Sequence, residues 1–526
     1  MNCRCEIKEP YNQWRLPTTD DGKPVAVPIH YDVDLEFSGL YESDKIDGNF
    51  YFNGTSTVEF VLNDDVCSFN LHVNGEYDIM SLLVFVDGSP ASVTFTLNTD
   101  YQYLTVFGDY KILMSSNVRV TVTYRVRMPT GLIGLYLAHY QNNEGQTRYL
   151  AATQFETIGA RMAFPCFDEP GLKATFTFSI KYKYDEYSAI FNTGVIRSTS
   201  DGTWTTNYYE TTMLMPTYLL AILVSDYHLE SKGVSDKGVH IRIVGRKGWE
   251  DQTEFALQEA LTIVDAMSDK FQYDYCRPFE GGECKSDQAA IPQFSFGAME
   301  NWGLITYREY YLFINEKRDP FLRKRAATSL IGHELIHMWF GNTVSCPWWD
   351  ELYINEAFGS IGGYLGLIFA KSNDEIDYQW EDEYLQGQTY SALITDGRPN
   401  SRPMVNNANN GDLRVETPSE ISGQFDGIGY DKSGSIMLMI RALIGDDLWT
   451  SGLVNYLYGQ EFGSANWAQL LGYWDDVLEL QDPALNLDGM TITEIMQPYF
   501  RQMGYPVLKI QSKARFDYFD TISVIL

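Results

Sequence analysis

Basic residues are scarce in this chain. Among its 526 residues, lysine and arginine together number 39 against 70 aspartates and glutamates, giving a formal net charge of −31 at pH 7. Nucleic acids and anionic membrane surfaces are bound through basic faces, so this balance argues against both as partners. It suits cationic ligands, although an acidic surface that serves only solubility is the competing explanation for most of these carboxylates.

A hydrophobic run long enough to cross a bilayer is also missing. The best apolar stretch, residues 213–224, is shorter than the roughly 20 residues of a membrane span and contains Pro216. Residues 1–5 (MNCRC) lack the apolar centre of a signal peptide. We therefore expect no membrane insertion by this chain and a soluble protein as given. Two locations stay open, the cytoplasm or the ectodomain of a membrane-bound or secreted protein.

Cysteines are few and odd in number. Seven of them do not make a disulfide scaffold in a chain of this length. Cys276 and Cys284 lie close enough in sequence to pair, but their spacing alone does not establish a bond. Stability must instead come from an apolar core, for which a chain with 44% hydrophobic and 14% aromatic residues has ample material.

Period-two alternation of apolar and polar residues runs through roughly the first 200 residues. Residues 118–126 (VRVTVTYRV) and 175–180 (TFTFSI) show it clearly, and turn dipeptides such as Asn74-Gly75 separate the alternating segments. Such segments form half-buried strands joined by short turns. The pattern therefore predicts an antiparallel, β-rich first domain.

A helical period replaces this alternation beyond Gly245. From Glu254 onward apolar residues recur every three or four positions, as on the buried face of a helix. A strand-like stretch, residues 506–511 (PVLKIQ), follows the helical region. We therefore predict a multidomain α+β protein with a β-rich domain over residues 1–228, a mainly helical domain over residues 229–504 and a further β segment over residues 505–526.

A His-Glu-x-x-His pattern occupies residues 333–337, and Glu356 follows it. Residues four apart on a helix are separated by about 40° around the axis and about 6 Å along it, so His333 and His337 can reach one ion. Glu334 lies beside them, where a carboxylate can act on a water without binding the metal. Glu356 as third ligand leaves one position open, which is typical of catalytic zinc. The pattern predicts one Zn²⁺ per chain and hydrolytic chemistry.

The same short pattern also arises by chance, with two partly buried histidines on an ordinary helix. The flanking sequence argues against chance. Residues 326–336 mix helix formers with apolar residues, which favours a helix under the motif. Residues 357–365 (AFGSIGGYL) predict a second apolar helix whose glycines permit close packing, so that Glu356 at its start can face both histidines.

Several blocks outside the metal motif occur in an order that a known family shares. They are residues 163–170 (AFPCFDEP), Gly297-Ala298-Met299-Glu300-Asn301, Gly341-Asn342, Trp348-Trp349 and Gly429-Tyr430-Asp431-Lys432. With the metal motif, they make the chain resemble the aminopeptidase N-like family of zinc metallopeptidases, the gluzincin aminopeptidases. The resemblance runs from residue 28 to residue 510.

The resemblance implies an N-terminal β domain, a thermolysin-like catalytic domain, a small β-sandwich and a large C-terminal helical domain that closes over the cleft. Residues 496–506 (MQPYFRQMGYP) resemble the stretch that ends the catalytic domain. We therefore expect only the start of a β-sandwich over residues 505–526 and no C-terminal helical domain in this chain.

The resemblance also implies catalytic roles. Zinc held by His333, His337 and Glu356 would activate a water, and Glu334 would take its proton. Tyr430 matches the family's catalytic tyrosine, which stabilises the developing oxyanion. By residue type alone Tyr430 is one of 36 tyrosines and could serve only for packing.

An aminopeptidase must hold the free α-ammonium of its substrate. Glu300 matches the family's amine anchor, and Gln154 and Glu156 match its companion segment, although Glu156 taken alone would be interpreted as a surface acid. Small residues at 297 and 298 would let a substrate strand lie close, and Met299 is expected to line the pocket for the first residue. The predicted substrate-binding set is Gln154, Glu156, Gly297, Ala298, Met299, Glu300 and Asn301, and the predicted partners are peptides with a free amino terminus.

Three segments depart from the family's usual residues, at four positions in total. Glu351 replaces an aspartate, Arg402 replaces a histidine, and Ala357-Phe358-Gly359 replaces Gly-Phe-Ala. If residue 351 orients a ligating histidine, the longer glutamate would loosen that support, which is typically worth about 10–100-fold in metal affinity or activity. The sequence alone assigns no consequence to Arg402.

Two functions follow from these patterns. The first is a zinc metallo-aminopeptidase that hydrolyses the N-terminal peptide bond of peptides through a metal-activated water, with an endopeptidase of the same metal class as the variant to separate from it. The second is a weakly active or inactive family member that acts as a peptide-binding receptor or scaffold, suggested by the expected lack of a lid domain and by Glu351.

Overall fold

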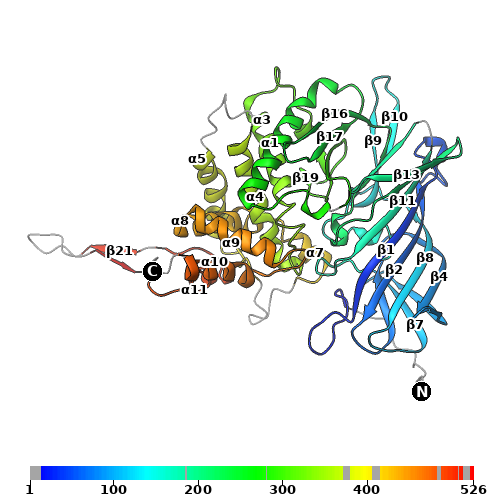
Figure 1. Cartoon of the computed structure of the whole chain (residues 1–526), viewed down its shortest axis with the longest axis horizontal. Helices are drawn as coiled ribbons and strands as arrows, with labels where there is room; N and C mark the ends of the chain where they lie inside the picture. Colours follow the sequence, from blue (N-terminus) through cyan, green and yellow to red (C-terminus); the bar gives the residue numbers. More distant parts are fainter. Residues whose placement is uncertain are drawn as a thin grey trace, which may run out of the picture.

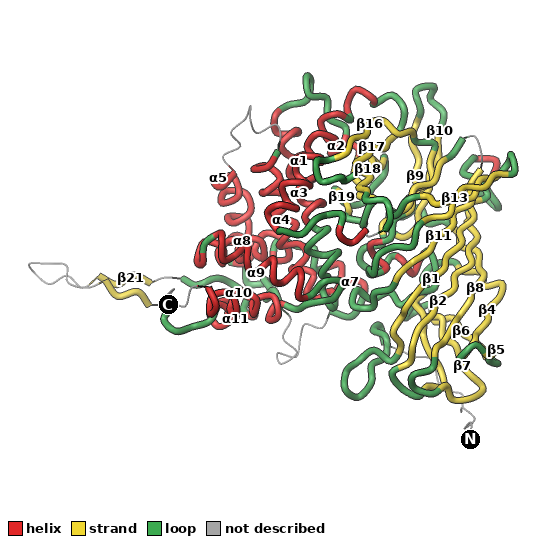
Figure 2. Tube along the Cα trace, viewed as in Figure 1, coloured by secondary structure: helices red, strands yellow, loops and turns green. Residues whose placement is uncertain are grey.

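The computed structural model describes residues 13–183, 186–279, 281–370, 380–405, 415–481, 487–507, 509–512 and 522–525. Strands gather on one side of the molecule and helices on the other (Figure 1). The same view coloured by secondary structure shows a second, smaller group of strands beside the helices (Figure 2). The predicted order, a β-rich domain followed by a mainly helical one, is confirmed.

Three sheets form the first domain. The strand orders are β13-β14-β11-β1-β2-β8-β4-β5, β3-β7-β6 and β12-β15-β10-β9. The strands are β1 (Ala26–Phe37), β2 (Tyr51–Leu62), β3 (Val66–His72), β4 (Tyr77–Val86), β5 (Ser89–Pro90), β6 (Val93–Asn98), β7 (Tyr103–Ile112), β8 (Asn117–Arg127), β9 (Gly134–Gln141), β10 (Thr147–Gln154), β11 (Thr175–Lys183), β12 (Ser188–Phe191), β13 (Val195–Ser200), β14 (Trp204–Tyr209) and β15 (Ile222–Ser225).

The alternating segments form the strands predicted for them. Residues 118–126 lie in β8 and residues 175–180 in β11, and both strands bury every second side chain. One pairing differs from the antiparallel prediction, because β1 runs parallel to β11, with His30 opposite Thr175. Parallel neighbours need a long crossover connection, and the chain between β1 and β11 provides one through the other strands of the domain.

A five-stranded sheet in the order β16-β17-β18-β20-β19 opens the second domain, ahead of most of the helices. The helical pattern did not reveal it, because a strand such as β18 is buried at every position and therefore shows no alternation. The strands are β16 (His228–Val234), β17 (His240–Gly245), β18 (Lys285–Ile291), β19 (Ala298–Met299) and β20 (Leu304–Arg308).

Helices make up most of the remaining chain. The first begins at Glu254, where the helical period begins, and ends at Phe271.

No helix within the described ranges is long and apolar enough to cross a membrane. The helices are α1 (Glu254–Phe271), α2 (Glu309–Leu312), α3 (Phe321–Ile336), α4 (Leu352–Phe369), α5 (Trp380–Tyr384), α6 (Tyr390–Asp396), α7 (Pro418–Ser422), α8 (Ser433–Ile444), α9 (Asp446–Gly459), α10 (Trp467–Gln481) and α11 (Ile492–Arg501), with π-helical turns at Leu385–Thr389 (η8) and Ile428–Lys432 (η10).

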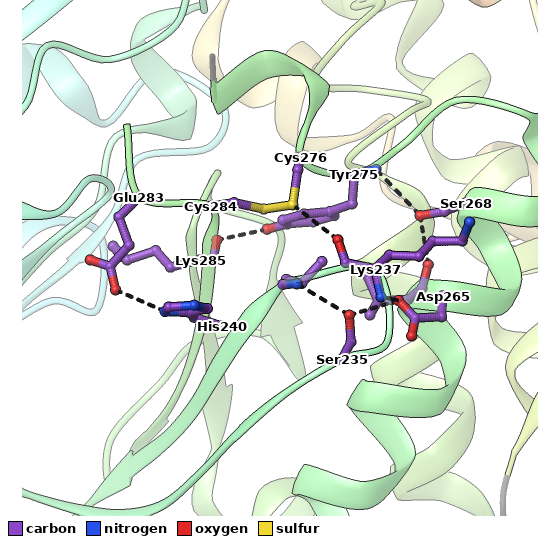
Figure 3. The surroundings of a disulfide bond; sticks show 12 residues. Ser235, Lys237, His240, Asp265, Ser268, Tyr275, Cys276, Glu283, Cys284 and Lys285 are labelled. Carbon is purple, nitrogen blue, oxygen red and sulfur yellow. Dashed lines mark hydrogen bonds and ion pairs between the residues drawn. A yellow bond between two sulfur atoms is a disulfide. The ribbon is translucent and has the colours of Figure 1, made fainter. Parts of the chain in front are cut away.

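Cys276 and Cys284 form a disulfide, which answers the question that their spacing left open (Figure 3). Their Cα atoms are 5.2 Å apart, within the usual range. The bond closes the loop between α1 and β18, and the carbonyl of Cys284 accepts the N–H of His240 at 3.0 Å. The start of β18 is therefore tied both to this loop and to β17.

The last described segments, β21 (Lys509–Ser512) and β22 (Ile522–Ile525), pair as an antiparallel hairpin. The predicted strand over residues 506–511 overlaps β21, although residue 508 lies outside the described residues. The domain boundaries at 228/229 and 504/505, and the expected lack of a C-terminal helical domain, stay predictions.

Candidate functional site

Two adjacent helices bring the predicted metal ligands together. His333 lies in the last turn of α3, His337 caps that helix and Glu356 lies near the start of α4. The Oε2 atom of Glu356 is 3.4 Å from Nε2 of His333 and 3.9 Å from Nε2 of His337, and the ligand atoms all lie within 4.8 Å of one another. Atoms that bind one tetrahedral zinc at about 2.0–2.1 Å are roughly 3.4 Å apart, so the three side chains fit a single ion.

Glycines permit the close approach of α3 and α4 that the sequence predicts. A Cβ on Gly332 of α3 would lie 2.5 Å from the carbonyl oxygen of Gly362 on α4, and a Cβ on Gly359 would lie 2.5 Å from Cε1 of His333. Non-bonded heavy atoms prefer about 3.5–4.0 Å. A larger residue at these positions would therefore separate the helices or displace the imidazole.

The surroundings of the two imidazoles fit metal binding. Nδ1 of His337 lies 3.0 Å from the backbone oxygen of Phe340, which leaves Nε2 to face Glu356. Burial lowers the pKa of His333 to about 4, so its ring is neutral at physiological pH. The Oε2 atom of Glu356 is buried without a hydrogen-bond partner in the part of the chain that the structure describes. A cation between these groups would satisfy that oxygen.

Four buried glutamates share this region. Burial and mutual repulsion raise the pKa of Glu156 and Glu334, and burial is the main cause of the raised pKa of Glu300 and Glu356. Oε1 of Glu156 and Oε1 of Glu300 have no hydrogen-bond partner among the residues that the structure describes. Within the described ranges, no lysine or arginine forms an ion pair with any of the four. Buried charge of one sign is costly unless it is paired, so the site favours cations.

The predicted substrate-binding residues lie on β10 and around β19. Gln154, the last residue of β10, donates through Nε2 to Sδ of Met299 at 3.3 Å. Nδ2 of Asn342 donates to the backbone oxygen of Glu300 at 3.0 Å, and Asn301 bonds Thr306. Ala298 and Met299 form the edge strand of the five-stranded sheet, next to the half-buried Gly297. An edge strand leaves backbone groups free to pair with an extended peptide.

Tyr430 comes from the π-helical turn η10, a widened turn of a kind that is frequent at functional sites. Its ring stacks on that of His333 with 6.3 Å between centroids. Burial first, and then the negative charge of Glu356, raises the pKa of Tyr430 well above its usual value. The phenol is therefore a proton donor beside the candidate metal centre. Both rings line a cavity of about 350 Å³.

Within the described residues, the hydrogen bonds of the Glu351 side chain go to groups other than the two histidines. Its Oε2 atom accepts hydrogen bonds from the hydroxyl of Tyr353 at 3.1 Å and from the backbone N–H of Trp467 at 2.8 Å. It therefore joins the start of α4 to α10. The replacement of aspartate by Glu351 was expected to weaken metal binding only if residue 351 orients a ligating histidine, and these hydrogen bonds give it a different role. Burial raises the pKa of Glu351 to about 7.

This raised pKa predicts a pH effect on stability. Between its unfolded value of 4.5 and its folded value of about 7, Glu351 holds more proton in the folded chain, so its ionisation weakens the fold as pH rises. Glu351→Gln keeps an acceptor but does not titrate. Relative to wild type, we expect this variant to gain up to about 3 kcal/mol between pH 5 and pH 8, measured as a growing difference in Tm. Parallel Tm profiles would contradict the prediction.

The sequence patterns did not reveal the two ion pairs that lie on either side of Tyr430. Arg402 forms a two-bond ion pair with Asp426, and Lys432 pairs with Asp396 at 2.7 Å. The departure at Arg402 was the available signal, but its partner is 24 residues away in sequence and only the fold reveals it.

Comparisons with known proteins agree with the resemblance. The model of the peptidase family M1 domain matches residues 255–499, and that of the peptidase M1 N-terminal domain matches residues 27–219. Aminopeptidase A of Gloydius brevicauda is 32% identical over 503 residues, covering 95% of this chain and 48% of the relative. Aminopeptidase N of Canis lupus familiaris is 31% identical over 514 residues, covering 96% of this chain and 50% of the relative. The chain thus spans about half the length of these relatives.

Proposed function

The chain belongs to peptidase family M1, and from this premise we propose that it is a zinc metallo-aminopeptidase. It would bind one Zn²⁺ through His333, His337 and Glu356 and hydrolyse the N-terminal bond of peptides that have a free amino terminus. Relatives named as aminopeptidases support the class of reaction. One observation carries the proposal: a three-ligand cluster lies beside buried glutamates that have no cationic partner within the described ranges.

The protein's own groups divide the work of the reaction. When bound, zinc supplies Lewis-acid polarisation of the scissile carbonyl and of the attacking water. Glu334 accepts the proton of that water, because its carboxylate is buried next to the metal ligands. Tyr430 donates a hydrogen bond to the oxygen that becomes negative as the water attacks.

Substrate selection falls to the other buried carboxylates. The unpartnered oxygens of Glu300 and Glu156 would bind the substrate's α-ammonium, with the amide oxygen of Gln154 as a third acceptor. The edge strand at Ala298 would pair with the peptide backbone next to Gly297, while Met299 borders the first side chain and Asn301 braces the strand through Thr306. A substrate without a charged amine would leave these acids buried and unpaired.

Paired substrates test this assignment. We expect cleavage of an aminoacyl anilide but not of its N-acetylated analogue, since acetylation removes the charge that the glutamates bind. Glu300→Gln keeps the shape and removes a charge, so we expect KM for the free-amine substrate to rise by about 10–100-fold, equivalent to the roughly 1.5–3 kcal/mol of a charged hydrogen bond.

Arg246→Gln, which breaks the ion pair between Arg246 and Glu309, is the control and should leave KM unchanged. Equal cleavage of the free and acetylated substrates would reject the exopeptidase assignment and favour an endopeptidase of the same metal class.

A further inference from the structure

Two ion pairs flank the turn that carries Tyr430. Arg402 pairs with Asp426, four residues before Tyr430, and Asp396 pairs with Lys432, two residues after it. Asp396 ends α6, and Arg402 lies in the segment that follows this helix. We call the two ion pairs together the clamp. The η10 turn is therefore held on both sides by a single neighbouring segment.

The Arg402 side of this clamp is a two-bond contact. Nε of Arg402 donates to Oδ2 of Asp426 at 3.0 Å, and a terminal nitrogen donates to Oδ1 at 2.9 Å. The same nitrogen also donates to the backbone oxygen of Gln424 at 3.2 Å. The planar guanidinium matches a carboxylate in this geometry, which an ammonium cannot do.

Asp426 passes this restraint to the turn. Its Oδ1 atom accepts the backbone N–H groups of Ile428 at 3.0 Å and Gly429 at 2.9 Å. Its backbone oxygen accepts the N–H of Tyr430 at 3.1 Å. The orientation of the Asp426 carboxylate thus decides where η10 begins, and Tyr430 follows in the same turn.

The clamped loop is also a wall of the site. Phe425, Asp426 and Tyr430 line the cavity of about 350 Å³ that His333 also lines. The guanidinium of Arg402 is not among the groups that line it. Arg402 therefore acts on the site through the loop.

We propose that Arg402 is a positioning residue, which holds the Gln424–Gly429 loop and thereby places the hydroxyl of Tyr430 beside the metal centre. The inference rests on the proposed catalytic role of Tyr430. Because the guanidinium of Arg402 does not line the cavity, we expect its loss to lower kcat with little effect on KM, since the transition state needs the phenol in place more than the bound substrate does.

A double-mutant cycle tests the coupling. We expect Arg402→Gln to lower kcat about tenfold in the wild-type background, a fraction of what loss of the phenol hydroxyl costs. In a Tyr430→Phe background the same substitution should change kcat less than twofold, because the group that it positions is gone. Arg402→Lys keeps the positive charge but cannot form the two-bond contact. Its kcat should lie between those of wild type and Arg402→Gln.

The control is Arg246→Gln. Arg246 also forms a two-bond ion pair with a carboxylate, that of Glu309, and its side chain is about as buried as that of Arg402. It should leave kcat unchanged. An equal loss from Arg402→Gln in both Tyr430 backgrounds would overturn the proposal and assign Arg402 a general structural role. A rise in KM at unchanged kcat would also overturn it and place Arg402 in substrate binding.

Hydrogen exchange gives a readout that does not depend on turnover. In Arg402→Gln we expect the amides of residues 424–433 to exchange about tenfold faster, while peptides from α1 keep their protection; Arg246→Gln should leave residues 424–433 unchanged. Unaltered exchange in this segment would refute the positioning role even in an inactive protein. A wild-type protein without turnover would reject the proposed function, and faster exchange in the variant would still establish the clamp.

Discussion

Glu334→Gln should lower kcat by about 10²–10⁴-fold while the protein keeps its zinc. Glu334 is buried next to the metal ligands but is not one of the three side chains that fit the ion. Glutamine has the same length and can still hydrogen bond to a water, but it cannot accept a proton at neutral pH. The loss should therefore fall on kcat, with KM close to that of wild type. Steady-state kinetics with an aminoacyl anilide, beside zinc content by atomic absorption, measures both quantities.

Two further variants distinguish loss of the general base from loss of zinc and from a general effect of replacing a buried glutamate. His337→Ala removes a ligand, so it should lose zinc and activity together. Glu351→Gln changes another buried glutamate of the same domain and should keep kcat near that of wild type. A Glu334→Gln protein with undiminished turnover would exclude Glu334 as the general base.

The zinc measurement also separates the enzyme from the receptor or scaffold hypothesis. Stoichiometric zinc with turnover that depends on Glu334 would eliminate the scaffold, whereas bound zinc without turnover would support it. One reason for considering a scaffold was the departure at Glu351. Because Glu351 contacts Tyr353 and Trp467 and not a histidine, it no longer argues against metal chemistry.

Local patterns predicted much of the fold. Alternation along β8 and β11 and the helical period from Glu254 each follow from burial of one face, which leaves a trace in a short window of sequence. Strand β18 left no trace because both of its faces are buried. The parallel pairing of β1 with β11 depends on the path of the chain between them, and no local pattern carries that information.

In the candidate site, too, local sequence patterns predicted some residues and not others. His333 and His337 could be proposed as joint ligands because helix geometry relates them directly, and Glu356 because a glycine-rich helix follows it. The grouping of Glu156 with Glu300 required the resemblance, since a lone glutamate is ordinarily exposed. Arg402 and Asp426 could not be paired from sequence, because an ion pair across 24 residues leaves no periodic signal.

Tyr430→Phe should reduce kcat by about 10²–10³-fold, the typical cost of removing one oxyanion donor. The substitution removes a single hydroxyl and leaves the ring that stacks on His333. Zinc content and KM should stay near their wild-type values, because the hydroxyl is needed when charge develops on the carbonyl oxygen and less when substrate first binds. Single-turnover and steady-state kinetics with the same anilide measure the loss.

Tyr227→Phe is the matched control, since its buried hydroxyl has no hydrogen-bond partner among the described residues and its ring lies against Tyr140 and not His333. It should leave kcat unchanged. A Tyr430→Phe protein with a raised KM and normal kcat would assign the phenol to substrate binding. Normal values of both would mean that the oxyanion depends on zinc and on other donors. The ion pair between Arg402 and Asp426 would then hold only the wall of the cavity. The predicted effect of Arg402→Gln on kcat therefore depends on the predicted effect of Tyr430→Phe.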